Sequence, residues 1–330
     1  MKRSINMGIA AAAVGLLALA GCTADTGGNG NGDSGGGDSG ASSDRDLSFA
    51  VVIHGDPDGS FWNVVKKGAE DAAADYGVEV TITGDQEGSA QATLIDSALA
   101  SSPDGLVVSL ANPDALSTSL QAAADADVPF ISINSGAEAA ADLGSLGHVG
   151  QDETIAGEGA GTEMAAAGVT NAICLIHEAG NIGLEQRCEG FANTLGGTVT
   201  NIQVDLNDPT ATQSTVQSTL LGDPSIDGVL GLNPSVTATA LEGVKGADSD
   251  ATVAGFDLDP DVLAGIEAGD ILFTVDQQQY LQGYLPIAML VLYSENLNTV
   301  GGGLPVLTGP SFVTADNVGA VSDLIENGTR

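Results

Sequence analysis

Short apolar runs rich in β-branched residues alternate with amphipathic stretches from Leu47 onward. The first run, Ser48–His54, has the length and composition of a buried strand. The stretch that follows, Phe61–Gly77, carries residues at the spacing of one helical face, namely Phe61, Val64, Val65, Gly68, Ala72 and Tyr76. The domain is therefore predicted to begin with a strand followed by a helix.

The same alternation continues along the chain. Further strands are predicted at Val78–Thr83, Gly105–Leu110, Phe130–Asn134, Ala172–His177, Val199–Val204, Gly228–Leu232, Thr252–Asp257 and Leu272–Asp276. Helices are predicted between them at Ser89–Ser101, Asn112–Ala126, Thr154–Ala167, Leu184–Leu195, Thr210–Leu221, Val236–Lys245 and Pro260–Ala268. Strands that alternate with helices in this way indicate an α/β fold, in which helices cover both faces of parallel sheets.

The number of strands favours two similar lobes. About four strands precede the glycine-rich stretch Gly144–Gly150 and about five follow it, which is too many for one small sheet. We therefore expect a hinge near His148–Asp152. Ligands of open parallel sheets bind beyond the carboxyl ends of the strands, so the site is predicted in the cleft between the lobes.

The first 21 residues have the pattern of a secretory signal peptide. Lys2 and Arg3 precede the apolar run Met7–Ala20, which is too short to span a bilayer. The run ends in Leu19-Ala20-Gly21-Cys22, which resembles the bacterial lipobox, whose cysteine becomes lipidated. Residues 1–21 are thus predicted to be removed, and Cys22 to anchor the protein to the outer face of the membrane. The alternative is an ordinary signal peptide in which Cys22 is incidental.

The segment after Cys22 has the composition of a tether. Residues 22–46 consist mainly of Gly, Ser, Asn and Asp, which predicts a disordered linker. The 23 residues Thr23–Arg45 give an r.m.s. reach of about 25 Å for a flexible chain. A folded domain held in this way can meet a membrane partner.

The charge of the chain excludes one class of partner. Eight Lys and Arg residues stand against 44 Asp and Glu residues, which gives a formal net charge of −36. Nucleic acid is excluded, because phosphate binding needs a basic face. Concentrated salt would screen the repulsion among these carboxylates, so the composition favours a protein from a high-salt or alkaline habitat. We expect its melting temperature to rise from dilute buffer to molar salt.

Two cysteines remain besides Cys22. Cys174 lies in a predicted strand and Cys188 in the following helix, and an extracellular location permits a disulfide. No feature of the sequence gives their Cα separation. A disulfide and two buried thiols therefore both remain open.

Motifs for catalysis and metal binding are weak. His54, His148 and His177 are isolated, without zinc-ligand spacing, and the chain has neither a GxSxG nucleophile elbow between a strand and a helix nor a P-loop. Asp56–Gly59 and Asp257–Asp261 resemble the start of calcium loops but lack the later Gly and Glu. We therefore expect no metal site, no cofactor and no enzymatic activity.

The residues that follow the predicted strands are polar or aromatic, and they suit a sugar. Aromatic rings cover the apolar face of a sugar ring, while Asn, Asp, Arg and Gln hydrogen-bond its hydroxyls. The residues in these positions are Phe61, Trp62, Ser109, Asn134, Ser135, Asn181, Arg187, Asn233, Asp257 and Gln277, with His54 and His177 as secondary candidates.

Several of these residues lie in short sequence motifs that resemble those of the ribose-binding-protein-like family, which consists of type I periplasmic solute-binding proteins. The motifs occur in the same order as in the family: Ser60-Phe61-Trp62, Ile133-Asn134-Ser135-Gly136, His148-Val149-Gly150-Gln151-Asp152, Arg187-Cys188-Glu189-Gly190-Phe191, Gly255-Phe256-Asp257 and Thr274-Val275-Asp276-Gln277-Gln278. The resemblance implies two Rossmann-like lobes joined by a three-segment hinge. It also implies a protein that captures a simple sugar and delivers it to the permease of an ABC importer.

The resemblance also assigns roles to individual positions. It matches Phe61 and Trp62 to stacking aromatics. It matches Arg187, Asn233, Asp257 and Gln277 to polar ligand contacts of the second lobe and the hinge. Ser109 stands where ribose binders have Asn, and Asn134-Ser135 stand where they have Asp-Arg, which leaves a pentose, a hexose or a modified sugar open. The alternatives are structural: helix capping or core packing for Phe61 and Trp62, turns for Asn134 and Asn233, an exposed linker position for Gln277, and an ion pair or helix-start contact for Arg187 and Asp257.

The hinge implied by the resemblance divides the chain into discontinuous lobes. Crossings are expected near 148–152, 276–278 and 301–307, so that the first lobe comprises 47–149 plus 278–304 and the second 150–277 plus 305–330. The protein is expected to act as a monomer. The alternative function is a receptor that presents a sugar or a furanose-like signal to a membrane sensor.

Overall fold

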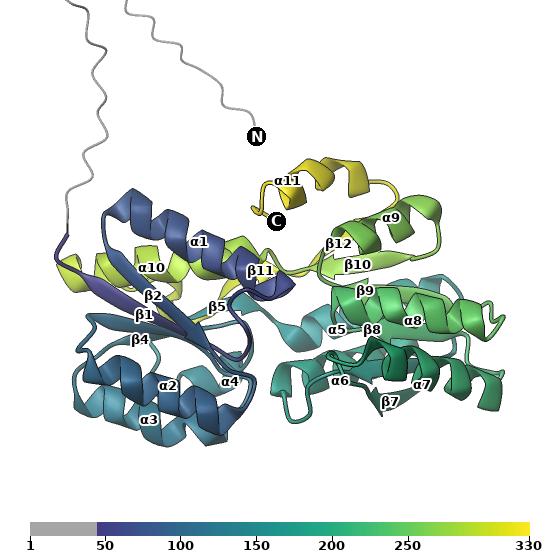
Figure 1. The fold of residues 1–330 in the computed structure, drawn as a ribbon, viewed down its shortest axis with the longest axis horizontal. Coiled ribbons are helices and arrows are strands. Elements are labelled where there is room, and N and C mark those ends of the chain that lie inside the picture. Colours follow the sequence, from purple (N-terminus) through teal and green to yellow (C-terminus); the bar gives the residue numbers. More distant parts are fainter. Residues whose placement is uncertain (1–44) are drawn as a thin grey trace, which may run out of the picture. The chain divides into compact units, whose positions relative to one another are not determined.

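Two six-stranded sheets organise residues 45–330, which are the residues that the computed structural model describes. The predicted signal peptide, the lipidation site Cys22 and nearly all of the predicted tether lie outside the described residues. The two sheets lie in two adjacent lobes, each with helices on both faces (Figure 1). Within residues 45–330 we find no helix that combines enough length and hydropathy to cross a bilayer.

The first lobe contains one sheet and its covering helices. The strand order is β11-β5-β4-β3-β1-β2, and all neighbouring strands are parallel. The strands are β1 (Ser48–Ile53), β2 (Glu79–Gly84), β3 (Gly105–Ser109), β4 (Phe130–Ile133), β5 (His148–Gln151) and β11 (Val306–Gly309). The helices are α1 (Ser60–Tyr76) and α10 (Gln279–Asn296) on one face, α2 (Gly88–Ala100) and α3 (Pro113–Asp125) on the other, and the short α4 (Ala137–Ala140).

The second lobe repeats this plan. Its strand order is β12-β10-β9-β8-β6-β7, and only β12 is antiparallel to its neighbour. The strands are β6 (Asn171–Ile176), β7 (Thr198–Gln203), β8 (Gly228–Gly231), β9 (Thr252–Phe256), β10 (Phe273–Asp276) and β12 (Ser311–Thr314). The helices are α5 (Glu153–Ala166), α6 (Ile182–Leu195), α7 (Pro209–Gly222), α8 (Pro234–Gly246), α9 (Pro260–Ala268) and α11 (Ser322–Glu326).

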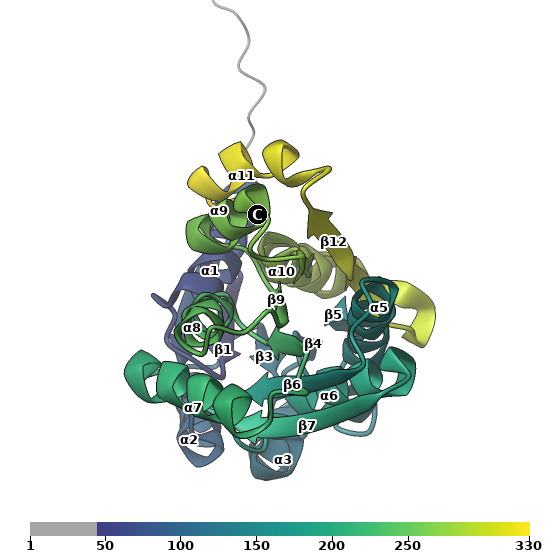
Figure 2. The same ribbon diagram turned by 90° about the vertical axis from the view of Figure 1, so that its right-hand side faces the viewer.

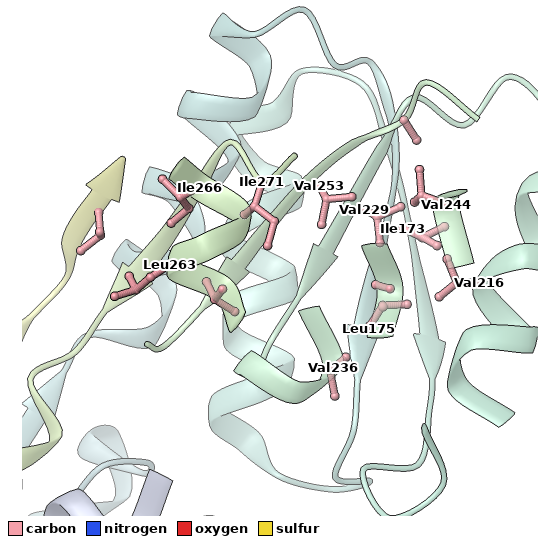
Figure 3. Packing of buried hydrophobic residues seen from close by; sticks show 14 of the residues in the cluster. Ile173, Leu175, Val216, Val229, Val236, Val244, Val253, Leu263, Ile266 and Ile271 are labelled. Atoms are coloured by element: carbon pink, nitrogen blue, oxygen red, sulfur yellow. The ribbon is translucent and has the colours of Figure 1, made fainter. Parts of the chain in front are cut away.

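Two apolar layers hold the second sheet between its helices. Figure 3 shows side chains of β6, β8 and β9 meeting those of α7, α8 and α9, and Ile173, Val229 and Val253 are all nearly inaccessible to solvent. The opposite face packs against α5 and α6 through residues such as Met164 and Phe191. The view along the lobes shows α7 and α8 on one side of β6 and α5 on the other (Figure 2). Both faces of the central strands β6, β8 and β9 are buried, which explains why these strands read as continuous apolar runs, whereas the edge strand β7 is largely exposed.

Every predicted strand and helix is present within two residues of its expected bounds. The strands β5, β11 and β12, the long helix α10 and the short helices α4 and α11 were not predicted. Residues 148–151 were interpreted as hinge, but they form β5, which pairs with both β4 and β11. Helix α10 contains Pro286 and an almost unbroken apolar run, so its sequence lacks a helical period.

The chain passes between the lobes at three places. It leaves the first sheet after β5, returns to the first lobe after β10 and leaves it again between β11 and β12. The third crossing was expected at 301–307 and this prediction is wrong, because residues 306–309 pair with β5 in the first sheet. The crossing therefore lies at Pro310, and residues 305–309 belong to the first lobe.

A disulfide joins the two cysteines of the second lobe. The sequence had left open whether they pair. Cys174 in β6 and Cys188 in α6 are bonded, with a Cα–Cα distance of 5.9 Å, and both are buried. The bond attaches α6 to the centre of the second sheet, one residue after Arg187.

Candidate functional site

The described part of the chain encloses a cavity of about 240 Å³ between the two lobes. Its lining comes from the segments that follow β1, β2 and β4 in the first lobe and β6 to β10 in the second. The lobes touch beside it, where the Ile182 N–H donates to the Ala111 carbonyl at 3.2 Å. The carboxyl ends of two parallel sheets thus face one another across the cavity, as expected for open α/β sheets.

The structure brings nearly all the predicted site residues into this lining. They are Phe61, Trp62, Asn134, Ser135, Asn181, Arg187, Asn233, Asp257 and Gln277, together with the secondary candidates His54 and His177. Ser109 is the exception. It is fully buried, and its Oγ lies 2.7 Å from Nδ1 of His54 and accepts the His54 backbone N–H at 2.8 Å. Ser109 therefore holds His54 in place instead of lining the cavity.

Three rings form the first-lobe wall. Trp62 makes edge-on contacts with both His54 and Phe61, with 4.8 Å between ring centroids in each pair. Gly55 allows this arrangement, since a Cβ at that position would lie 2.2 Å from the indole nitrogen. A wall of this kind can cover the apolar face of a small ring.

Burial keeps the histidines of the site uncharged. It lowers the pKa of His54 below its usual value and lowers that of His177 to about 4, although Glu178 opposes both shifts. At neutral pH both imidazoles are therefore neutral, and each offers one donor and one acceptor.

Arg187 forms the second-lobe wall together with a buried carboxylate. Its Nε and Nη2 donate to the two oxygens of Glu153 at 2.6 and 3.0 Å, and its Nη1 donates to the Leu232 carbonyl at 3.3 Å. The guanidinium carbon lies 4.6 Å from the ring centroid of Phe256. A guanidinium has five N–H donors, so two remain for a ligand in the cavity. The ion pair expected as the structural alternative for Arg187 is present, and Arg187 still lines the cavity.

A chain of hydrogen bonds forms the hinge side of the cavity. Asn134 donates to Oε1 of Gln277 at 3.0 Å, and Nε2 of Gln277 donates to Oδ1 of Asp257 at 2.8 Å. Gln279 donates to the same Asp257 oxygen at 3.2 Å, whereas Oδ2 of Asp257 has no partner among the described residues. Burial raises the pKa of Asp257 to about 7, although Arg187 opposes this shift. Asp257 can thus switch between accepting and donating a hydrogen bond near neutral pH.

Two of the predicted asparagines also cap helices. Asn181 Oδ1 accepts from the Gly183 N–H at the start of α6, and Asn233 Oδ1 accepts from the Ser235 N–H at the start of α8. Each side chain still has its amide NH₂. That of Asn181 donates to Glu178 at 2.7 Å.

Several lining residues were not among the predicted site residues. Gln86 follows β2, Asn207 follows β7 and Glu178 follows β6. The rule that sites lie after strands would have found Gln86 and Asn207 had it been applied to the edge strands as well. Glu153, the partner of Arg187, is not part of the lining, and the rule gave no reason to select it. Among residues 45–330 we find no cluster of His, Cys, Asp and Glu that could hold a metal ion.

Comparison with known proteins gives consistent matches. A family model described as the periplasmic binding protein domain matches residues 49–297. The xylose/arabinose-binding protein of Sulfolobus acidocaldarius is 27% identical over 245 residues, which cover 68% of this chain and 60% of that protein. The ribose import binding protein of Bacillus subtilis is 29% identical over 238 residues, which cover 68% of this chain and 74% of that protein. The chain thus spans less than two thirds of the first relative and about three quarters of the second.

Solved structures show the same two-lobed fold. A carbohydrate transporter from Acidothermus cellulolyticus, crystallised with myo-inositol, is 37% identical with a TM-score of 0.84 and covers 86% of this chain and 99% of its own. A carbohydrate transporter solute binding protein from Agrobacterium radiobacter, crystallised with D-arabinose, is 26% identical with a TM-score of 0.73 and covers 86% and 99%. These relatives are named as binding proteins and transporters, in agreement with the expectation that the chain is not an enzyme.

Proposed function

Because the chain belongs to the family of periplasmic binding protein domains, we propose that it captures a neutral monosaccharide or cyclic polyol between its lobes and delivers it to an ABC importer. The observation that carries this proposal is the composition of the cavity. Aromatic rings line one side, hydroxyl-binding amides and carboxylates line the other, and both lobes contribute. A ligand that contacts both lobes stabilises the closed arrangement.

The charges around the cavity favour a neutral ligand. Among the residues that the structure describes, Arg187 is the single cation in the lining, and Glu153 already neutralises it. Asp56, Glu178 and Asp257 add carboxylates to the lining. A sugar acid or sugar phosphate would therefore meet no unpaired positive charge and would be repelled.

The size of the cavity favours a single ring. Its volume of about 240 Å³ lies below the roughly 300–1,000 Å³ typical of drug-sized ligands. The ligands named for the relatives are xylose, arabinose, ribose and myo-inositol. Each of them is uncharged and forms a single ring. The 37% identity to the protein crystallised with myo-inositol adds cyclic polyols to the sugars suggested by the sequence.

A titration of neutral and anionic ligands tests the proposal. We expect one member of a panel of pentoses, hexoses and inositols to raise the melting temperature, because a ligand stabilises the folded state that binds it. The same ligand should change the fluorescence of Trp62, the only tryptophan of the chain. Matched uronic acids are the control and should have no effect. Stronger binding of a uronic acid than of its neutral parent would contradict the proposed selectivity.

The proposed location is the outer face of the cell membrane, with Cys22 lipidated. Cys22→Ser should release the protein into the medium, because the anchor is then lost while the signal peptide can still direct export. Immunoblotting of membrane and medium fractions measures this. Retention of Cys22→Ser on the membrane at the wild-type level would refute the lipid anchor.

A further inference from the structure

A segment of the first lobe without charged residues exposes several large apolar side chains. In a chain with 16% charged residues, residues 296–315 contain none. Of the nine large hydrophobic residues that are most exposed among the described residues, five lie within 292–307. Leu297 and Leu304 are 75% and 72% exposed, and Val300 lies between them at 38%. We call Leu297, Val300 and Leu304 the apolar loop.

The apolar loop lies at the end of the first lobe where the chain enters it. Arg45, the first described residue, pairs with Glu295 at 2.7 Å, two residues before Leu297. The loop leads into the start of β11, and β1 starts shortly after Arg45. Because β1 and β11 belong to one parallel sheet, their starts lie at the same end of that sheet, opposite the carboxyl ends that line the cavity.

We infer that the apolar loop docks onto the surface of a lipid bilayer. This inference rests on the proposed lipid anchor at Cys22. The 23 residues Thr23–Arg45 extend to at most about 80 Å. They therefore hold Arg45, and the apolar loop beside it, close to the membrane. Exposed leucine and valine side chains gain free energy by entering the interface between headgroups and acyl chains. The segment that carries them, residues 296–309, contains no charged residue.

The geometry favours lipid over a protein partner. Delivery of a sugar requires the cavity to face the permease, and the apolar loop lies at the opposite end of the first sheet. The same end of the lobe carries carboxylates: Glu295 pairs with Arg45, and Asp46, Glu79 and Asp104 line a hollow together with Arg45. The contact with lipid is therefore apolar and not electrostatic. Weak docking suffices, because a short tether raises the local concentration of the loop at the membrane to the millimolar range. In the docked state the cavity would be directed away from the lipid, so the loop would have to leave the bilayer before the cavity could face the permease.

The first test places a fluorescent probe in the apolar loop. The chain from residue 22, with Cys22→Ser, is mixed with phosphatidylcholine vesicles that contain brominated acyl chains, at millimolar lipid, which is the local concentration that the tether would provide. We expect Leu304→Trp to be strongly quenched, since its added indole enters the bilayer, and the matched variant Leu221→Trp in the second lobe not to be. Leu221 is 61% exposed, which makes it a fair control. Equal quenching of the two variants would overturn the inference.

The second test removes the apolar loop. Leu297→Ser/Leu304→Ser should lower vesicle co-sedimentation by about tenfold, whereas Leu221→Ser/Leu272→Ser should leave it unchanged. Binding should persist in molar salt, because an apolar contact is not screened. The inference fails if the loop variant sediments like the wild type. It also fails if the protein sediments only with vesicles that contain the permease. A dimer of two chains that the double substitution abolishes would likewise contradict it, because the loop would then contact protein and not lipid.

These outcomes are separable from the proposed function. Sugar binding by the same variants is measured in solution by calorimetry, where no membrane is present. Wild-type sugar affinity together with lost vesicle binding supports the docking surface. Loss of sugar binding in every protein, including the wild type, would refute the proposed function and leave the vesicle result to stand alone.

Discussion

Arg187→Ala is expected to reduce sugar affinity by more than a hundredfold. Arg187 lines the cavity, and two of its five N–H donors have no partner among the described residues, so the substitution removes up to two charge-assisted hydrogen bonds to the ligand. Each ligand hydroxyl that stays buried without a partner costs about 1–3 kcal/mol, and every 1.4 kcal/mol is about tenfold in affinity. Calorimetric titration with the sugar identified in the ligand panel measures the loss.

The control must separate binding from folding. Arg187→Ala leaves Glu153 buried and uncompensated, which costs about 3–5 kcal/mol of stability for a buried pair. Arg187→Met/Glu153→Leu removes both charges with little change in volume, so we expect it to fold but not to bind. Arg187→Lys keeps the charge, loses the planar fork and should bind weakly. Wild-type affinity in the folded double variant would show that Arg187 has only a structural role.

Sugar affinity is expected to rise with pH up to about pH 7 and then to level off. Asp257 has a pKa raised to about 7 by burial, and a sugar hydroxyl that donates to its free Oδ2 favours the ionised form. Binding therefore releases protons below pH 7 and is stronger at pH 8 than at pH 5. His54 and His177 add little in this window, because burial lowers both pKa values.

Stability without ligand should change in the opposite direction. The folded pKa of Asp257 lies above its unfolded value of about 3.9, so between these values the folded protein holds a proton that the unfolded chain releases. The free energy of unfolding contributed by Asp257 is therefore largest below pH 4 and is lost as the pH rises to 7. Asp257→Asn should flatten both profiles. An unchanged pH dependence of affinity in Asp257→Asn would assign the titration to another group.

The fold was predictable wherever a local period exists. Helix α1 buries Val65, Gly68 and Ala72 of the face that the sequence predicted, and it also buries Trp62 and Ala69, which lie beside that face. Strand β5 and helix α10 gave no such signal. The four residues of β5 are strand only because β4 and β11 flank them, and β11 follows more than 150 residues later.

The candidate site was predictable to the extent that it follows the ends of strands. Asn134 and Asp257 come directly after a strand, Asn233 comes two residues after one, and all three line the cavity. Ser109 obeys the same rule, but its short side chain is covered by His54. The pairing of Arg187 with Glu153 joins the starts of two helices 34 positions apart, and only their packing in three dimensions brings them together.

The three crossings also determine the order in which the molecule can be completed during its synthesis and export. One face of the first sheet, with Phe49, Val51 and Val107, is covered partly by Ile287 and Leu290 of α10. These helix residues emerge only after the whole of β6 to β10 has been made, and β11 and β12 complete the two sheets later still. Neither lobe can therefore finish folding before almost the entire chain is available, and a nascent chain that is still incomplete keeps an exposed apolar sheet face. Such a chain remains loosely folded, which suits passage through a translocation pore that accepts unfolded chains.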